Sequence, residues 1–160
     1  MNRTAAFSFS SSPHPDRTAP RPERPSPGAP LRILLAESDS TLRRLMALVL
    51  RADGHDVIEA NDGSDLLEAV ASLLLDDEHP IDVIMAAQAL TGIPGTSVLA
   101  GIRSRGGRMP FVLVTGDAFA QRQARRLGAV ALDHPFDAGA IRLAVRAAAA
   151  LTPSSAAADP

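Results

Sequence analysis

Short, mostly apolar runs alternate with amphipathic segments through the middle of the chain. Runs of three or four such residues are typical of strands that are covered on both faces. Segments with apolar residues at every third or fourth position are typical of helices with one buried face. The runs that predict strands are 33–36, 57–60, 83–86, 111–114 and 130–132. The segments that predict helices are about 40–52, 64–75, 96–105, 118–127 and 138–151.

Residues at the segment ends support these helix limits. Asp39 or Ser40 can cap the first helix, because a short polar side chain accepts hydrogen bonds from free backbone N–H groups. Asp117 and Asp137 can do the same for the fourth and fifth helices, and Asp53-Gly54 stops the first. The side chains predicted to face inward are Leu42, Leu45, Met46, Val49, Leu67, Val70, Leu74, Leu99, Ile102, Ile141, Val145 and Leu151.

The alternation of strands and helices predicts the fold class. Each strand is followed by a helix, so we expect parallel pairing through right-handed crossovers, with helices on both faces of the sheet. The fold class is α/β, a doubly wound five-stranded parallel sheet in a single domain. In open sheets of this kind the site lies beyond the carboxyl ends of the strands. The candidates that follow strand ends are Glu37, Ser38, Ala87, Thr115 and His134.

The first thirty residues differ in composition from the rest of the chain. Residues 1–30 hold seven of the thirteen prolines, five serines and almost no large apolar side chain. Such a segment buries too little apolar surface to offset the entropy lost on ordering. We therefore expect a disordered Pro/Ser/Arg-rich extension over 1–30, a folded domain over 31–151 and a flexible tail over 152–160, with no fused output domain.

The overall composition excludes several kinds of site and partner. The chain has no cysteine, which excludes disulfides and thiolate sites, and its sixteen basic residues are all arginine. A net charge of −2 gives no overall attraction to nucleic acid or to a membrane. No apolar run reaches the roughly 18 residues that span a bilayer. We expect a soluble, cytoplasmic protein with no nucleic-acid or membrane partner, no bound metal and no cofactor.

Six short segments occur in an order and spacing that are specific when taken together. They are 33–39, 54–63, 81–84, 92–95, 114–116 and 134–136. In this order they resemble the receiver (CheY-like) domain of bacterial two-component response regulators, over about 31–150. The resemblance implies a flavodoxin-like fold in which an aspartate takes a phosphoryl group from a histidine kinase. It also implies Mg²⁺ held by acidic residues, together with a lysine and a threonine beside the phosphoryl group.

Position by position, the resemblance implies a degenerate site, a pseudo-receiver. Glu37 matches the first acidic position, but Ser38 stands at the second. Ala87 matches the phosphoacceptor, and a methyl group cannot accept a phosphoryl group. His134 stands in place of the lysine, whereas Thr115 matches the threonine. Glu37 and His134 are expected either to form a hydrogen-bonded pair across the vacated pocket or to remain solvated at its rim.

These features predict a signalling protein rather than an enzyme. We expect a stand-alone receiver-like protein that contacts a histidine kinase or another phosphorelay protein without being phosphorylated. A basic stripe on the fourth predicted helix, formed by Arg122, Arg125 and Arg126, is the candidate contact surface. The rival interpretation is a sensor in which a small ligand or ion occupies the vacated pocket.

Overall fold

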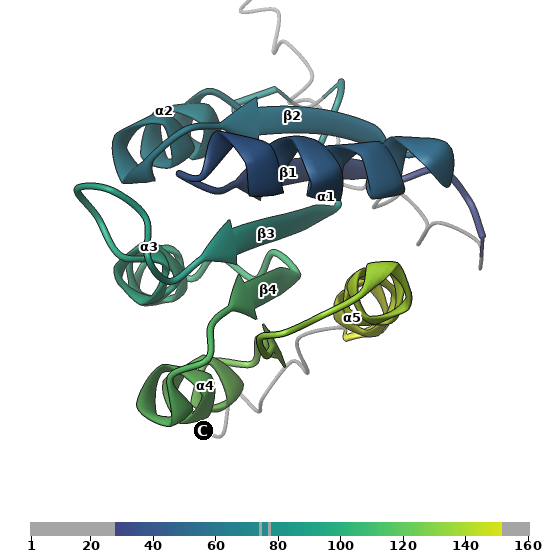
Figure 1. Ribbon diagram of the computed structural model, residues 1–160. Coiled ribbons are helices and arrows are strands. Elements are labelled where there is room, and N and C mark those ends of the chain that lie inside the picture. Colours follow the sequence, from purple (N-terminus) through teal and green to yellow (C-terminus); the bar gives the residue numbers. More distant parts are fainter. Residues whose placement is uncertain (1–27, 74, 77, 152–160) are drawn as a thin grey trace, which may run out of the picture.

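The computed structural model describes residues 28–73, 75–76 and 78–151, in which strands and helices alternate strictly (Figure 1). The strands are β1 (Arg32–Ala36), β2 (Asp56–Ala60), β3 (Val83–Ala87), β4 (Phe111–Val114) and β5 (Val130–Leu132). The helices are α1 (Ser40–Ala52), α2 (Gly63–Leu73), α3 (Gly95–Ser104), α4 (Ala118–Arg126) and α5 (Ala138–Ala150). The predictions made for 1–27 and 152–160 lie outside the described residues. Within the described ranges, no helix is long and apolar enough to cross a membrane.

The five strands form one parallel sheet in the order β2-β1-β3-β4-β5. The predicted fold class, an α/β doubly wound parallel sheet, is confirmed. The chain first builds outward from β1 to β2 and then returns to place β3 on the other side of β1. This return is the topological switch point, where the loops after β1 and β3 separate and leave room for a site.

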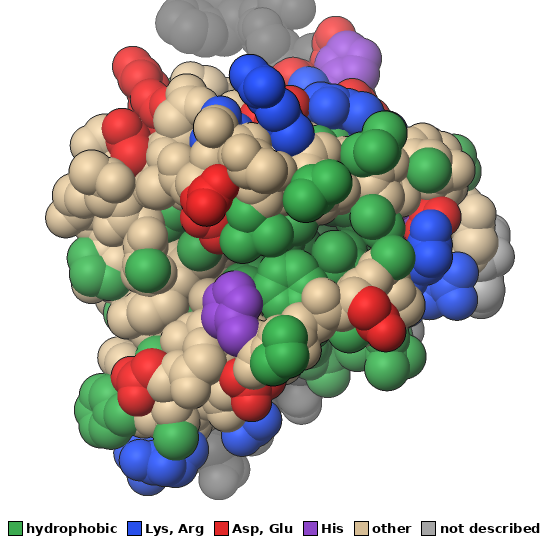
Figure 2. Space-filling view, viewed as in Figure 1, with side chains coloured by type: hydrophobic (Ala, Val, Ile, Leu, Met, Phe, Trp, Pro, Cys, Tyr) green, Lys and Arg blue, Asp and Glu red, His purple; other side chains and the backbone are tan. Residues whose placement is uncertain are grey.

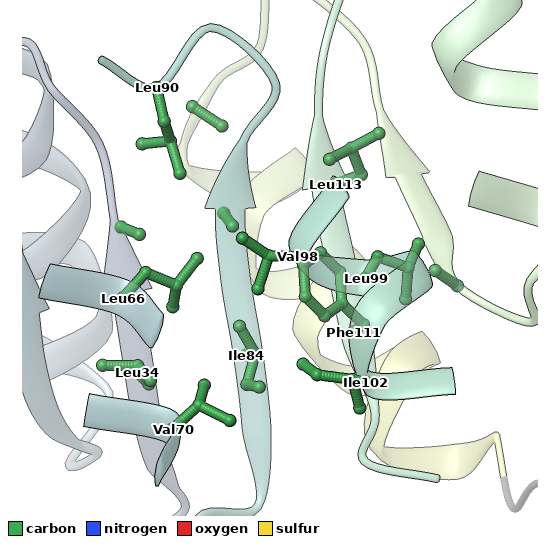
Figure 3. Close-up of a cluster of buried hydrophobic side chains, with 14 of the residues drawn as sticks. Leu34, Leu66, Val70, Ile84, Leu90, Val98, Leu99, Ile102, Phe111 and Leu113 are labelled. Carbon is green, nitrogen blue, oxygen red and sulfur yellow. The ribbon is translucent and has the colours of Figure 1, made fainter. Parts of the chain in front are cut away.

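Helices cover both faces of the sheet, with α1 and α5 on one face and α2, α3 and α4 on the other (Figure 1). Successive side chains of a strand point to opposite faces. In β1, Leu34 therefore packs beneath α2 and α3, while Ile33 and Leu35 pack beneath α1 and α5. Figure 3 shows the first of these two cores, with Leu34, Leu66, Val70, Ile84, Leu90, Val98, Leu99, Ile102, Phe111 and Leu113. Burial on both faces explains why the strands are apolar runs without alternation.

The inward faces of two helices differ from the prediction. Leu45 in α1 is 56% exposed and Leu67 in α2 is 38% exposed, so both predictions are wrong. In each case an adjacent apolar residue, Met46 or Leu66, is buried instead. Neighbouring residues on a helix point about 100° apart, so the packing of the whole helix decides which of two adjacent apolar residues faces the sheet. Leu151 is the C-cap residue just after α5 and is 46% exposed, so the prediction that it faces inward is also wrong.

The other helix-face predictions agree with the structure in the described part of the chain. Buried residues among those predicted are Met46, Val70, Leu99, Ile102, Ile141 and Val145. Leu42 and Val49 are partly buried against the core, and Leu74 lies outside the described residues. The predicted caps are also present, since Asp39, Asp117 and Asp137 each accept hydrogen bonds from backbone N–H groups in the first turn of their helix.

Arg103 fastens the end of α3 to the segments around it. Its Nε donates to the Leu127 carbonyl at 2.8 Å, Nη1 donates to the Gly107 carbonyl at 3.0 Å, and Nη2 to that of Met109 at 2.9 Å. Burial lowers the pKa of the Arg103 guanidinium from its ordinary value, because desolvation disfavours the charged form. The three carbonyl oxygens offset part of that cost, and one of them fixes the C-terminal end of α4.

Candidate functional site

The register of the sheet brings four of the predicted site residues to one edge. Ala36 pairs with Ala86, and Ala87 pairs with Val114. The residues that follow β1 and β4 therefore flank Ala87 at the end of β3. Glu37, Ser38 and Thr115 are those residues. His134 follows β5 at the same edge, two residues beyond Leu132, which pairs with Val114.

Ala87 is only 4% exposed, and the start of α3 lies directly against it. A Cβ added to Gly95 would lie 2.4 Å from the Ala87 carbonyl oxygen and 2.8 Å from Leu113 Cδ1. Real Cβ atoms do not approach so closely, so only glycine fits at this first position of α3. The backbone at the start of α3 thus packs against the end of β3, where Ala87 is buried.

The loop after Ala87 is closed by a residue that the sequence analysis missed. Gln88 Oε1 accepts a hydrogen bond from Thr96 N–H at 2.9 Å, and the Gln88 carbonyl accepts from Gly95 N–H at 3.2 Å. The residue at the α3 N-cap position, Pro94, has no side-chain acceptor, so Gln88 supplies the missing cap from a distance. The signal that could have found Gln88 is the proline at the start of the third predicted helix, which leaves that helix without a capping side chain of its own.

Glu37 is 7% exposed and is bonded within its own loop. Its Oε1 accepts a hydrogen bond from Asp39 N–H at 2.9 Å, and its carbonyl accepts from Arg43 Nη1 at 2.7 Å. Within the described residues, no hydrogen bond or ion pair joins Glu37 to His134, so the predicted pair is not formed. The alternative of a solvated rim position fits His134, which is exposed, but does not fit Glu37. Arg43 was missed because it lies in the first turn of α1, seven residues beyond the end of β1.

Ser38 and Thr115 also hold internal hydrogen bonds. Ser38 Oγ accepts from Thr91 N–H at 2.9 Å, which joins the loop after β1 to the loop after β3. Thr115 is 5% exposed, and its Oγ1 accepts from Asp117 N–H at 3.0 Å. The Thr115 carbonyl accepts from Gln121 Nε2 at 3.0 Å, so this one residue anchors the start of α4 twice.

Within the described residues, no hydrogen bond or ion pair joins His134 to Glu37, Ser38 or Thr115. Its ring centroid is 5.1 Å from that of Phe136, and the peptide bond to Pro135 is cis. A Cβ added to Gly116 would lie 3.9 Å from the His134 Cβ, so the start of the His134 side chain lies beside the loop after β4. In the part of the chain that the structure describes, no three His, Asp or Glu side chains are arranged to hold a metal ion.

The predicted basic stripe lies on the outside of α4. Arg122, Arg125 and Arg126 are all exposed, and Figure 2 shows basic side chains gathered over this helix at the bottom of the view. The exposed face of α4 also carries Phe119, which is 65% exposed and which the sequence analysis did not single out. Only Ala120 and Ala124 of α4 are buried.

Comparison with models of protein families shows to which family the chain belongs. The family model described as the response regulator receiver domain matches residues 33–146. The chain belongs to the response regulator receiver domain family. Receiver domains are signalling domains of two-component systems that interact with histidine kinases or other phosphorelay proteins, and they are generally not enzymes. A signalling role is therefore supported for this chain.

Curated relatives are longer than this receiver domain. The transcriptional regulatory protein PdtaR of Mycobacterium tuberculosis is 36% identical over 126 residues, which cover 72% of this chain and 57% of PdtaR. The regulatory protein AtoC of Escherichia coli is 28% identical over 120 residues, which cover 73% of this chain and 25% of AtoC. The chain thus spans between a quarter and just over half of the length of these relatives.

Solved structures share the fold over most of the described chain. A putative response regulator from Chloroflexus aurantiacus matches with a TM-score of 0.65 at 25% identity, covering 76% of this chain and 99% of that one. The chemotaxis response regulator CheY4 of Vibrio cholerae matches with a TM-score of 0.64 at 18% identity, covering 75% of this chain and 99% of that one. The predicted CheY-like, flavodoxin-like fold is confirmed.

Proposed function

We propose that this receiver domain signals by protein contact without accepting a phosphoryl group. The observation that carries the proposal is the methyl group of Ala87 at the end of β3, the position that matches the phosphoacceptor of the family. An alanine side chain has no oxygen with which to attack phosphorus. The neighbouring carboxylate of Glu37 is buried and accepts a backbone hydrogen bond.

The groups that assist phosphoryl transfer in the family are also replaced. Ser38 stands at the second acidic position and accepts a hydrogen bond from Thr91 N–H. An acidic cluster is what would attract Mg²⁺, because that ion prefers carboxylate and water oxygens. His134 stands at the lysine position, and the chain has no lysine that could substitute for it.

The hydrogen bonds of Thr115 support a contact surface that needs no phosphoryl signal. Both the hydroxyl and the carbonyl of Thr115 accept hydrogen bonds from the first turns of α4, through Asp117 N–H and Gln121 Nε2. At its other end, α4 is followed by Leu127, whose carbonyl is held by Arg103. We infer that a helix held at both ends needs no phosphoryl group to hold its position. We place the partner contact on this helix, through Arg122, Arg125 and Arg126, and we assign the partner to the histidine kinases or other phosphorelay proteins.

A phosphorylation assay tests the proposal. The natural chain, incubated with acetyl phosphate and Mg²⁺, is expected to incorporate no hydroxylamine-sensitive phosphate. The amide NMR signals of α4 are likewise expected to stay in place. The matched positive control is the triple variant Ala87→Asp/Ser38→Asp/His134→Lys, which restores the acceptor, the second acid and the lysine and is expected to be labelled. Hydroxylamine-sensitive labelling of the natural chain would overturn the proposal.

The ligand-sensing alternative stays a prediction. The polar groups that would line such a site, those of Glu37, Ser38 and Thr115, already accept internal hydrogen bonds. A thermal-shift screen against small anions and divalent metals tests it, because a ligand that binds only the native state raises the melting temperature.

A further inference from the structure

We propose that α4 binds an acidic segment of a partner protein, with an apolar side chain of that segment seated on Phe119. The inference rests on the proposed function, since it assigns the chemistry of the partner at the same contact surface. It adds Phe119 to the contact surface, so that the apolar contact lies at the start of α4 and the charged contact lies toward its end.

The packing of α4 is the first observation behind this proposal. The helix faces the core with its small side chains, because only Ala120 and Ala124 are buried. Its large apolar residue, Phe119, is 65% exposed. An aromatic ring left in water is available to bury apolar area against another molecule, and aromatic residues are enriched where proteins bind one another.

The charges of α4 are the second observation. Among the described residues, none of Arg122, Arg125 and Arg126 forms an ion pair or a side-chain hydrogen bond. Arg122 stands three and four positions before the other two, so like charges face one another along the helix. The helix dipole favours cations in the last turn, which accounts for Arg125 and Arg126. Among the described residues no carboxylate pairs with Arg122, and the helix dipole does not favour a cation this early in the helix, so this charge is open to a carboxylate of another molecule.

The spacing of these residues sets the geometry of the partner. Phe119, Arg122 and Arg126 stand at positions i, i+3 and i+7, which share one face of a helix. At a rise of about 1.5 Å per residue, Phe119 and Arg126 are about 10 Å apart along the axis. An extended segment advances about 3.3 Å per residue, so an apolar residue and a carboxylate three residues apart would match the two ends.

Charge at the Phe119 end favours a protein segment over a nucleic acid. Asp117 lies just before α4, and Asp133 is exposed beside the same loop, where its Oδ1 lies 3.6 Å from a Cβ added to Gly116. Carboxylates at this end repel a phosphate backbone, and the chain as a whole carries a net charge of −2. An apolar side chain meets no such repulsion at Phe119.

Two peptides and one oligonucleotide test the proposal by NMR titration of the ¹⁵N-labelled full chain. The first peptide has a leucine three residues before a run of glutamates, and the second has serine in place of that leucine. The oligonucleotide is a single strand of thymidines of similar charge. We expect the leucine peptide to shift amide signals of 118–126, to bind more tightly than the serine peptide, and to weaken as salt is raised. The oligonucleotide is expected to leave these signals unmoved.

Matched variants locate the contact. Arg122→Glu/Arg126→Glu is expected to weaken binding of the leucine peptide at least about tenfold, because it turns attraction into repulsion. Arg44→Glu/Arg146→Glu makes the same change of net charge on α1 and α5, at exposed arginines without ion pairs in the described chain, and is expected to leave binding nearly unchanged. Phe119→Ser is expected to remove the preference for leucine over serine.

Four results would overturn the inference. They are no shift at α4 up to about 1 mM peptide, shifts centred on the exposed leucines of α1 and α5, equal losses in both double variants, and tighter binding of the oligonucleotide to α4. Repeating the titration with acetyl phosphate and Mg²⁺ separates the two proposals. Peptide binding at α4 that appears only with the phosphodonor would contradict the proposed function and leave the chemistry of the α4 contact standing.

Discussion

The carboxyl edge of the sheet and the outer face of α4 differ in whether their polar side chains are hydrogen-bonded within the protein. At the edge, Glu37, Ser38 and Thr115 each accept a hydrogen bond from a backbone N–H group of the same chain. On α4, Arg122 and its two basic neighbours have no ion-pair partner within the described residues. The two regions are joined by the short loop between β4 and α4, in which Thr115 belongs to the sheet edge and also anchors the start of α4.

The difference follows from burial. A polar group out of reach of water and without a hydrogen-bond partner costs about 1–3 kcal/mol, so the buried groups of the edge are paired inside the protein. Exposed charges remain hydrated and need no internal partner. Internal pairing leaves the edge few free groups for chemistry, whereas the charges of α4 are free to meet another molecule. This contrast supports the proposal that the receiver domain meets its partner through α4.

The largest expected effect tests how tightly the edge is closed. Gly95→Ala places a Cβ against the Ala87 carbonyl oxygen, which is backbone and cannot rotate away, so we expect a loss of about 3 kcal/mol in the free energy of unfolding. The control is Gly101→Ala in the same helix, where an added Cβ meets nothing within 4 Å. That change is expected to stabilise by about 0.5–1 kcal/mol. Urea denaturation measures both, and a neutral Gly95→Ala would show that the edge is loosely packed.

A second change tests the anchor at the far end of α4. Arg103→Leu removes three donors from the carbonyls of Leu127, Gly107 and Met109, and we expect it to cost about 2 kcal/mol of stability. Arg105→Leu, two residues later and exposed, is expected to stay within about 0.5 kcal/mol of the natural chain. Amide hydrogen exchange should show faster opening of α4 in the first variant alone. Equal exchange in the two variants would contradict the role of Arg103 as an anchor.

The smallest effect concerns the bond between the two loops of the edge. Ser38→Ala leaves Thr91 N–H without its acceptor, and because this region is partly exposed, water can replace much of the bond. We expect a loss of about 1 kcal/mol, measured by thermal and urea unfolding. Ser40→Ala, at an exposed position in the first turn of α1, is the control and is expected to be nearly neutral. A Ser38→Ala variant as stable as the control would mean that the edge is not held by this bond.

Much of the fold could be predicted from the sequence, because local signals agree with the tertiary arrangement. The apolar runs predicted every strand, and the capping side chains of Asp39, Asp117 and Asp137 marked helix starts that the structure confirms. Which of two adjacent apolar residues faces inward could not be predicted. Leu45 and Met46 fit the periodic pattern about equally well, and only the position of α1 on the sheet separates them.

The sequence by itself determined the chemistry available at the strand ends. It placed Ala87, Ser38 and His134 just at or after predicted strands and provided no lysine, because residue identity and the succession of strands along the chain can be read from the sequence. Only the tertiary structure decided how the remaining polar groups are used. Glu37 turns to Asp39 N–H rather than to His134, and Phe119 lies in water while alanines face the core. Whether Glu37 meets His134, and whether Phe119 is covered, depends on distances between segments far apart in sequence, and these distances are fixed only when the helices pack on the sheet.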